Sequence, residues 1–329
     1  MLSMKKIIIN CIGVSVTEGM AMVGHHSAEY GKDSYPAQLY TMLVDNGYNV
    51  KVNNYGHGGE KVAEIGVRCG AFACVTTEEL VLPKTYERVS LGKRIVENEN
   101  SMKTKLKIIC ETEEDDREVF FTQMSHDTNP VIIDSNPCIM SVVNGNENVI
   151  TLANPVGADV VIPKNSLVLT ANNKNADINI FYGGINDGDK LALKDFIYIM
   201  KKCGDVNGGK SLIIGSTHAI WEKWNDLEGT KEEKYDKYKR ECQKTFGPRF
   251  VDLYDEFSRH SMDIALEEGC FRDKTQEELN VMRYKLKNHI LPKEFCYDHQ
   301  TENDVHLSKE GYTVFAKIVF ERLKSLNYI

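Results

Sequence analysis

Short apolar runs alternate with segments of helical spacing in the first and last parts of the chain. Continuous apolar runs bounded by turn residues indicate buried parallel strands. Strands that alternate with helices indicate a parallel sheet with helices on its faces. The predicted strands are Ile7–Ile9, Asp177–Tyr182, Ser211–Ser216 and Arg249–Leu253, together with Tyr48–Asn54, in which apolar and polar residues alternate. The predicted helices are Tyr35–Asn46, Glu60–Cys69, Leu191–Cys203, Lys231–Phe246, part of Met262–Leu291, and Tyr312–Leu326.

The pattern changes between about Phe72 and Ala176, where no helical period is seen. Short apolar or alternating runs separated by turn residues indicate strands, and Asn144-Gly145-Asn146 is a hairpin signal. The predicted strands are 88–96, 104–111, 118–123, 130–133, 138–143, 148–152, 159–162 and 166–169. We therefore expect an all-β domain, a barrel or a sandwich, inserted into the α/β pattern. The predicted domains are 1–71 and 177–329 for the α/β core and 72–176 for the insert.

Composition narrows the classes of partner. The 329 residues are 42% hydrophobic and 27% charged, which is typical of a globular chain. The net charge of −8 disfavours nucleic acid as a partner, because proteins that hold a phosphate backbone usually carry a basic stripe. No apolar stretch approaches the roughly 20 residues that span a bilayer, so no membrane partner is expected.

Cysteine and histidine usage gives no metal signature. The nine cysteines are scattered singly without a Cys-x-x-Cys pair, so no zinc site is expected, and neither His25-His26 nor His57 predicts another metal site. Such thiols suit a reducing compartment.

Lys5 and Lys6 precede an apolar run that is short and has no small-residue cleavage site after it. We expect a cytoplasmic chain, or one without a cleaved signal peptide.

Four loops that follow predicted strands or precede the last helix carry residues suited to acyl transfer. In chain order they offer Ser15, Gly59, Asn186 and His306. Each residue alone is common in turns and caps. Together they supply a hydroxyl nucleophile, a backbone N–H, a side-chain amide and an imidazole base. In open α/β sheets such loops meet at the carboxyl edge of the strands.

These loops resemble the four sequence blocks of the SGNH hydrolases, also called GDSL esterases and lipases. The family's Gly-Asp-Ser-x-Thr-x-Gly is similar to Gly13–Gly19, and its Asn-x-Gly-x-x-Gly to Asn54–Gly59. Its Gly-x-Asn-Asp appears as Gly184–Asp187, and its final histidine block as His306–Gly311. The resemblance implies a flavodoxin-like three-layer sandwich around a five-stranded, mostly parallel sheet. It covers residues 5–70 and 177–325.

Two positions depart from the family pattern. Val14 stands where the family has the Asp before the serine. The family's acid usually precedes the histidine by three residues, and here that position is Asn303, with Asp304 two residues before the histidine. Either Asp304 orients His306, or Asn303 does so as a neutral acceptor, which would stabilise the imidazolium less. Asp298 is a third candidate.

The resemblance implies a carboxylic ester hydrolase without metal or cofactor. Ser15 would be the nucleophile and His306 the general base. The oxyanion would be bound by the N–H groups of Ser15 and Gly59 and by the amide of Asn186.

The family acts on acetylated sugars, lipids, short esters and thioesters. We expect an O-acetyl group on a carbohydrate, with Trp221, Trp224 and Tyr182 as stacking platforms. The alternative for the two tryptophans is that they only pack a loop. One alternative is a catalytically weak protein whose β insert binds a glycan or a protein partner. Another is an O-acyltransferase that uses the same serine. The insert is also the expected place of contact in a homo-oligomer.

Overall fold

Two sheets of different kinds form in separate parts of the chain. The computed structural model describes residues 5–19, 33–85, 87–95, 101–109, 119–121, 129–154, 157–170, 176–188, 191–297 and 299–329. The first unit comprises Met1–Gly58, Asn175–Ile197 and Asn207–Ile329. The second comprises Gly59–Lys174 and Tyr198–Val206. The domain bounds expected from the sequence stay a prediction.

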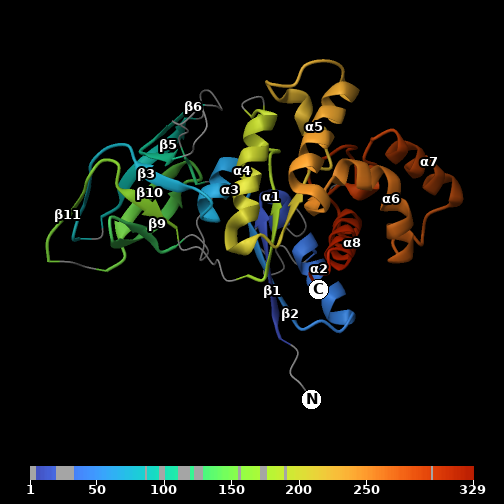
Figure 1. Cartoon of the computed structure of the whole chain (residues 1–329), viewed down its shortest axis with the longest axis horizontal. Helices are drawn as coiled ribbons and strands as arrows, with labels where there is room; N and C mark the ends of the chain where they lie inside the picture. Colours follow the sequence, from blue (N-terminus) through green and yellow to red (C-terminus); the bar gives the residue numbers. More distant parts are fainter. Residues whose placement is uncertain are drawn as a thin grey trace. The chain divides into compact units, whose positions relative to one another are not determined.

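The first unit contains a five-stranded sheet in which every neighbouring pair is parallel (Figure 1). In order across the sheet, its strands are β15 (Phe250–Val251), β14 (Ser211–Ile214), β13 (Ile178–Tyr182), β1 (Ile7–Gly13) and β2 (Val50–Gly56). Each contains or overlaps a strand expected from an apolar run. The mixed α/β class with a five-stranded parallel sheet is therefore confirmed.

The strands around β1 end at the same level. Gly13 is paired with Tyr182 of β13 on one side and with Gly56 of β2 on the other. A Cβ atom on Gly13 would lie 2.6 Å from the carbonyl oxygen of Tyr182, and one on Gly56 would lie 2.0 Å from the backbone nitrogen of Glu18. Only glycine allows backbones to approach so closely. The loops that follow β1, β2 and β13 therefore leave the sheet together.

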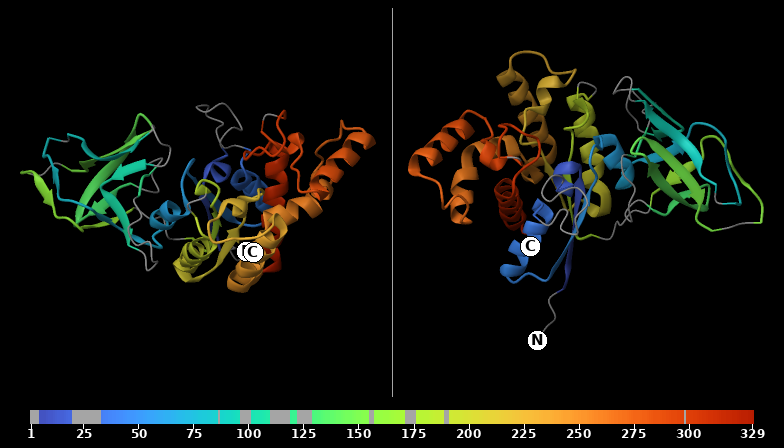
Figure 2. Two further views of the ribbon diagram at one scale, coloured as in Figure 1. Left: turned by 90° about the horizontal axis from the view of Figure 1, so that it is seen from above. Right: turned by 180° about the vertical axis from the view of Figure 1, so that it is seen from behind.

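The first unit also contains helices. They are α1 (Ser15–Glu18), α2 (Tyr35–Asp45), α5 (Lys231–Phe246), α6 (Leu253–Glu267), α7 (Gln276–Lys287) and α8 (Lys309–Ser325), together with the first residues of α4 (Leu193–Asp205). Thr230 and Thr275 begin α5 and α7 with capping boxes. The helices α2 and α8 lie side by side (Figures 1 and 2). The ring of Tyr35 on α2 stacks on that of Phe315 on α8, with ring centroids 4.1 Å apart.

The last predicted strand of this sheet is shorter than expected. Leu253 was expected to end a strand but begins α6, so β15 keeps only Phe250–Val251. As an edge strand, β15 bonds to β14 alone. Asp255 and Glu256 in the first turn of α6 favour the start of a helix, because carboxylates stabilise its positive end.

The second unit contains a curled, antiparallel eight-stranded sheet. Its strands are, in order, β6 (Ser101–Thr104), β5 (Val89–Ile95), β10 (Glu147–Leu152), β9 (Asn136–Val143), β8 (Val131–Ile133), β12 (Leu167–Leu169), β3 (Ala73–Thr76) and β7 (Leu106–Ile109). A two-stranded sheet pairs β11 (Val160–Ile162) with β4 (Leu80–Leu82). The expected hairpin joins β9 to β10, with positive φ at both Asn144 and Gly145.

One predicted strand of this unit is replaced by a side-chain contact. Residues 119–121, the described part of the predicted strand 118–123, form no strand. The backbone N–H and carbonyl of Phe121 are instead bonded to the side chain of Asn148, at 2.9 and 2.8 Å. Asn148 is fully buried. Its amide therefore satisfies a backbone that the sheet leaves unpaired.

The second unit also holds α3 (Val62–Arg68) and most of α4. The guanidinium of Arg68 forms a bidentate ion pair with the carboxylate of Glu60, with a shortest distance of 2.6 Å. Both side chains are buried. Glu64 accepts from the backbone N–H groups of Lys61 and Phe120. Buried charges of α3 are thus hydrogen-bonded within the unit.

Candidate active site

Ser15 and His306 form a hydrogen-bonding pair although 291 residues separate them in the chain. Nε2 of His306 lies 3.0 Å from Oγ of Ser15. Ser15 follows the end of β1 and is 6% exposed. His306 lies in the loop before α8, which begins at the N-cap Ser308, whose hydroxyl accepts from the backbone N–H of Gly311 at 3.2 Å. The arrangement allows proton transfer between hydroxyl and imidazole.

Asp304 provides the carboxylate beside the other nitrogen of the ring. Its Oδ1 lies 3.9 Å from Nδ1 of His306. The same oxygen accepts a hydrogen bond from the backbone N–H of His306 at 3.0 Å. A distance of 3.9 Å is a charge contact and not a hydrogen bond. The carboxylate can nevertheless stabilise an imidazolium that forms at this position.

Asn303 bonds elsewhere. Its Oδ1 accepts from the backbone N–H of Leu291 at 2.7 Å, and its own N–H donates to the carbonyl of Leu291 at 3.0 Å. Its φ of 56° is left-handed, a conformation that asparagine tolerates better than most residues. The geometry therefore favours Asp304 over Asn303 as the group that orients His306. Asp298 lies outside the described residues.

The loops after β2 and β13 carry the predicted oxyanion donors. Asn186 follows β13 in a turn that contains Gly184 with a φ of 98°, and its side chain is partly exposed. The loop after β2 is held to β1 by the N–H of His57, which donates to the carbonyl of Gly13 at 2.8 Å. Gly59, with a φ of 79°, is the first residue of the second unit. The donor roles of Gly59 and Asn186 stay predictions.

The predicted stacking platforms are core residues. Trp221, Trp224 and Tyr182 are 1%, 2% and 0% exposed. Trp221 stacks on Tyr238 with centroids 5.2 Å apart, because the short 3-10 helix that contains it packs against α5. Trp224 packs on Phe196 at 5.1 Å. The prediction that these rings contact substrate was wrong, since no sugar can reach their faces in this fold.

His218 is a second histidine near His306 that the sequence analysis missed. It follows β14, whose last residue, Ile214, pairs with Tyr182, so its loop leaves the sheet at the level of the others. Its Nε2 lies 3.1 Å from the carbonyl oxygen of Asn303, and its Nδ1 lies 2.8 Å from Oγ1 of Thr217. Burial lowers the pKa of His218 below its usual value. Its position after a buried strand is the signal that could have identified it.

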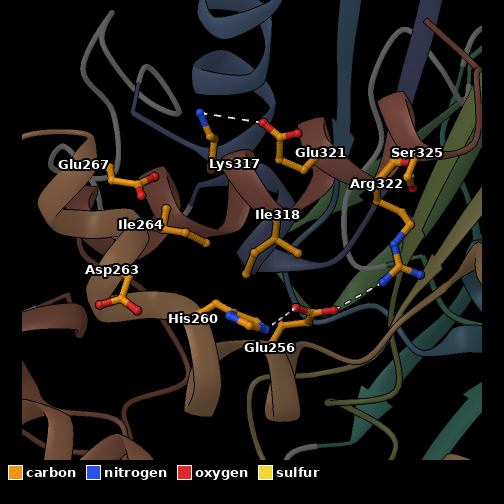
Figure 3. A pocket seen from close by; sticks show the side chains of 10 residues that line it. All are labelled: Glu256, His260, Asp263, Ile264, Glu267, Lys317, Ile318, Glu321, Arg322 and Ser325. Carbon is orange, nitrogen blue, oxygen red and sulfur yellow. Dashed lines mark hydrogen bonds and ion pairs between the residues drawn. The ribbon is translucent and has the colours of Figure 1, made fainter.

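A separate hollow of about 600 Å³ lies between α6 and α8 (Figure 3). Its walls carry the ion pairs Arg322–Glu256, at 3.2 Å, and Lys317–Glu321, at 3.8 Å. It shares no residue with the site around Ser15. Partly exposed charges that already pair with one another do not by themselves indicate a ligand site.

In the described residues, no cluster of three or more histidine, cysteine, aspartate or glutamate side chains is placed to hold a metal ion. His25 and His26 lie outside those residues. The thiol of Cys11 is buried, which raises its pKa to about 12.

None of the helices in the described part of the chain combines the length and apolar character that crossing a membrane requires.

Comparisons with protein-family models and with curated proteins found no match.

Proposed function

We propose that the protein is a serine esterase of the SGNH type. The observation that carries the proposal is the 3.0 Å contact between Oγ of Ser15 and Nε2 of His306, with Asp304 beside Nδ1. The order of the four sequence blocks and the parallel sheet on which they lie support the same interpretation.

The mechanism follows from these contacts. His306 takes the proton of the Ser15 hydroxyl as its oxygen attacks an ester carbonyl, and returns it to the departing alcohol. Water, activated in the same way, then hydrolyses the acyl-enzyme. Asp304 stabilises the imidazolium that forms in both steps. The N–H of Ser15 and the amide of Asn186 would bind the oxyanion.

The low exposure of Ser15 favours a compact acyl group such as acetyl. We propose an O-acetylated carbohydrate as the substrate class. Transfer to a second alcohol would use the same acyl-enzyme. A product analysis with an added sugar acceptor distinguishes hydrolysis from transfer, since only an O-acyltransferase yields an acylated acceptor.

A fluorophosphonate probe tests the proposal. The expected result is a mass increase on the peptide that contains Ser15, together with hydrolysis of p-nitrophenyl acetate. Ser15→Ala and His306→Ala should each lower kcat by about a thousandfold or more. The exposed Ser325, at the end of α8, gives the matched control Ser325→Ala, which should keep full activity. Turnover that survives in Ser15→Ala would refute the proposal.

The surface of the second unit favours a second candidate function, contact with protein. The exposed large apolar side chains in its described part are all aliphatic, namely Val81, Ile109, Ile139, Val161, Leu167 and Leu169. Leu167 and Leu169 also line a hollow of about 510 Å³ within this unit. Leu167 and Leu169 lie on one strand beside this hollow, and exposed aliphatic side chains that gather beside a hollow indicate a protein contact.

We propose a second copy of the chain as the partner to test first. Light scattering of the full chain should then show a dimer that Leu167→Lys and Leu169→Lys shift to monomer. A chain that is monomeric at all concentrations would contradict this candidate.

A further inference from the structure

We infer that His218 is a positioning residue of the candidate active site. It would hold the peptide between Asn303 and Asp304, and thereby keep the Asp304 carboxylate beside His306. This inference rests on the proposed function, because it concerns the same serine and histidine.

The first support is the way in which Asn303 is held. Two hydrogen bonds with the backbone of Leu291 fix its N–H and its side-chain oxygen, and Nε2 of His218 lies 3.1 Å from its carbonyl oxygen. The carbonyl of Asn303 and the nitrogen of Asp304 belong to one rigid peptide plane. A hydrogen bond donated to that carbonyl therefore fixes the orientation of the peptide that leads into Asp304.

The second support is the tautomer of His218. A backbone carbonyl only accepts hydrogen bonds, so the proton of the neutral ring must be on Nε2. Nδ1 then accepts from the hydroxyl of Thr217, 2.8 Å away. The N–H of His218 donates to Oγ of Ser216 at 3.0 Å, which fixes the backbone from which the ring extends. Each polar group of the ring thus has a defined partner.

The third support is the charge state. Burial lowers the pKa of His218, while the Asp304 carboxylate and the backbone carbonyls of Asn303 and Asp304 act to raise it, and His306 acts to lower it. Burial is the largest of these effects. A neutral His218 places no positive charge next to the imidazolium that His306 must form. The arrangement is therefore compatible with general base catalysis by His306.

The test compares two substitutions at this position. In His218→Leu the donor is lost, the peptide can rotate and Asp304 can move. Because an error of about 1 Å at a reacting group can cost about a hundredfold, we expect kcat to fall by roughly 10- to 100-fold. KM should change less than kcat, and the acid limb of the pH profile should move to lower pH. His218→Gln keeps an amide donor and should retain most of the activity.

A second measurement does not depend on activity. Amide hydrogen exchange should speed up at residues 303–306 in His218→Leu but not in His218→Gln, because the hydrogen bond from His306 to Asp304 becomes easier to break. The matched control is the exposed His260 on α6, whose substitution by Leu should change neither exchange nor kcat. If His218→Leu does not fold, Thr217→Val takes its place in the test. This variant removes the hydroxyl that bonds to Nδ1 of His218 with little change in volume, and it should also lower kcat.

Exchange at residues 303–306 and a pH profile that both match wild type in His218→Leu would overturn the inference. Equal losses in His218→Leu and His218→Gln would do the same, because they would indicate ring packing and not hydrogen bonding. A wild-type chain that neither hydrolyses esters nor reacts with the fluorophosphonate would instead refute the proposed function and this role with it. A wild-type chain that is active beside an unaffected His218→Leu would refute only the inference.

Discussion

Asp304 and His306 meet through the same carboxylate oxygen, which accepts from the backbone N–H of His306 at 3.0 Å and lies 3.9 Å from its Nδ1. An aspartate that bonds to the N–H two residues later forms an Asx turn. This turn brings the carboxylate back toward the ring that follows it. Under the proposed function, this turn would let an acid two residues before the histidine act as the acid that the SGNH pattern usually places three residues before it.

Asp304→Asn removes the negative charge of this side chain but keeps the oxygen that closes the Asx turn. The asparagine oxygen can still accept from the N–H of His306, so the loop should keep its conformation. Loss of the charge should lower kcat by about a hundredfold or more, with KM nearly unchanged. Steady-state kinetics on p-nitrophenyl acetate measure the change.

Asn303→Asp is the matched variant, because its carboxylate can still accept from the N–H of Leu291. It should keep activity within several-fold of wild type. If Asn303→Asp were nearly inactive while Asp304→Asn kept full activity, the assignment of Asp304 would be wrong.

Asn186→Ala should reduce kcat by roughly 100- to 1000-fold, because one donor to the oxyanion is lost. KM should change little, since the donor acts mainly in the transition state. The exposed Asn280 on α7 gives the control Asn280→Ala, which should behave as wild type. Stopped-flow measurement of p-nitrophenol release separates acylation from later steps. An unchanged acylation rate would remove Asn186 from the site.

Trp221→Ala should act on stability. Trp221 is 1% exposed and packs against Tyr238 and Tyr254. Its removal should lower the free energy of unfolding by about 3–5 kcal/mol. The 69% exposed Tyr284 is the control, and Tyr284→Ala should stay within about 0.5 kcal/mol. Urea unfolding gives both values. A Trp221→Ala chain of normal stability with a raised KM would restore the substrate role.

Much of the fold could be predicted from the sequence because buried parallel strands leave a clear signal. Runs such as Ile7–Ile9 and Leu212–Ile214 are apolar along their whole length, and a turn-forming residue, Asn10 or Gly215, follows each of them. The strands β3, β4 and β6 were not predicted. They have four, three and four residues, too few for an alternating pattern to stand out.

The candidate active site shows a different limit on what can be predicted from the sequence. A tryptophan after a strand has the same local pattern whether it lines a cleft or fills a core, so the burial of Trp221 depends on distant contacts with α5. The turn at Asn303 is fixed by Leu291 and His218, which precede it by 12 and 85 residues. Such long-range hydrogen bonds have no local signature. They decide which of two neighbouring residues faces the imidazole.

The wide separation of Ser15 and His306 also bears on protein synthesis. A ribosome must add 291 more residues after the serine before the imidazole that activates it exists. Under the proposed function, the Ser15 hydroxyl would therefore stay inert until His306 has been made. Ester turnover would begin only once the last helix is made and docked, so the onset of hydrolysis in a cell-free translation reaction would time the completion of the α/β core.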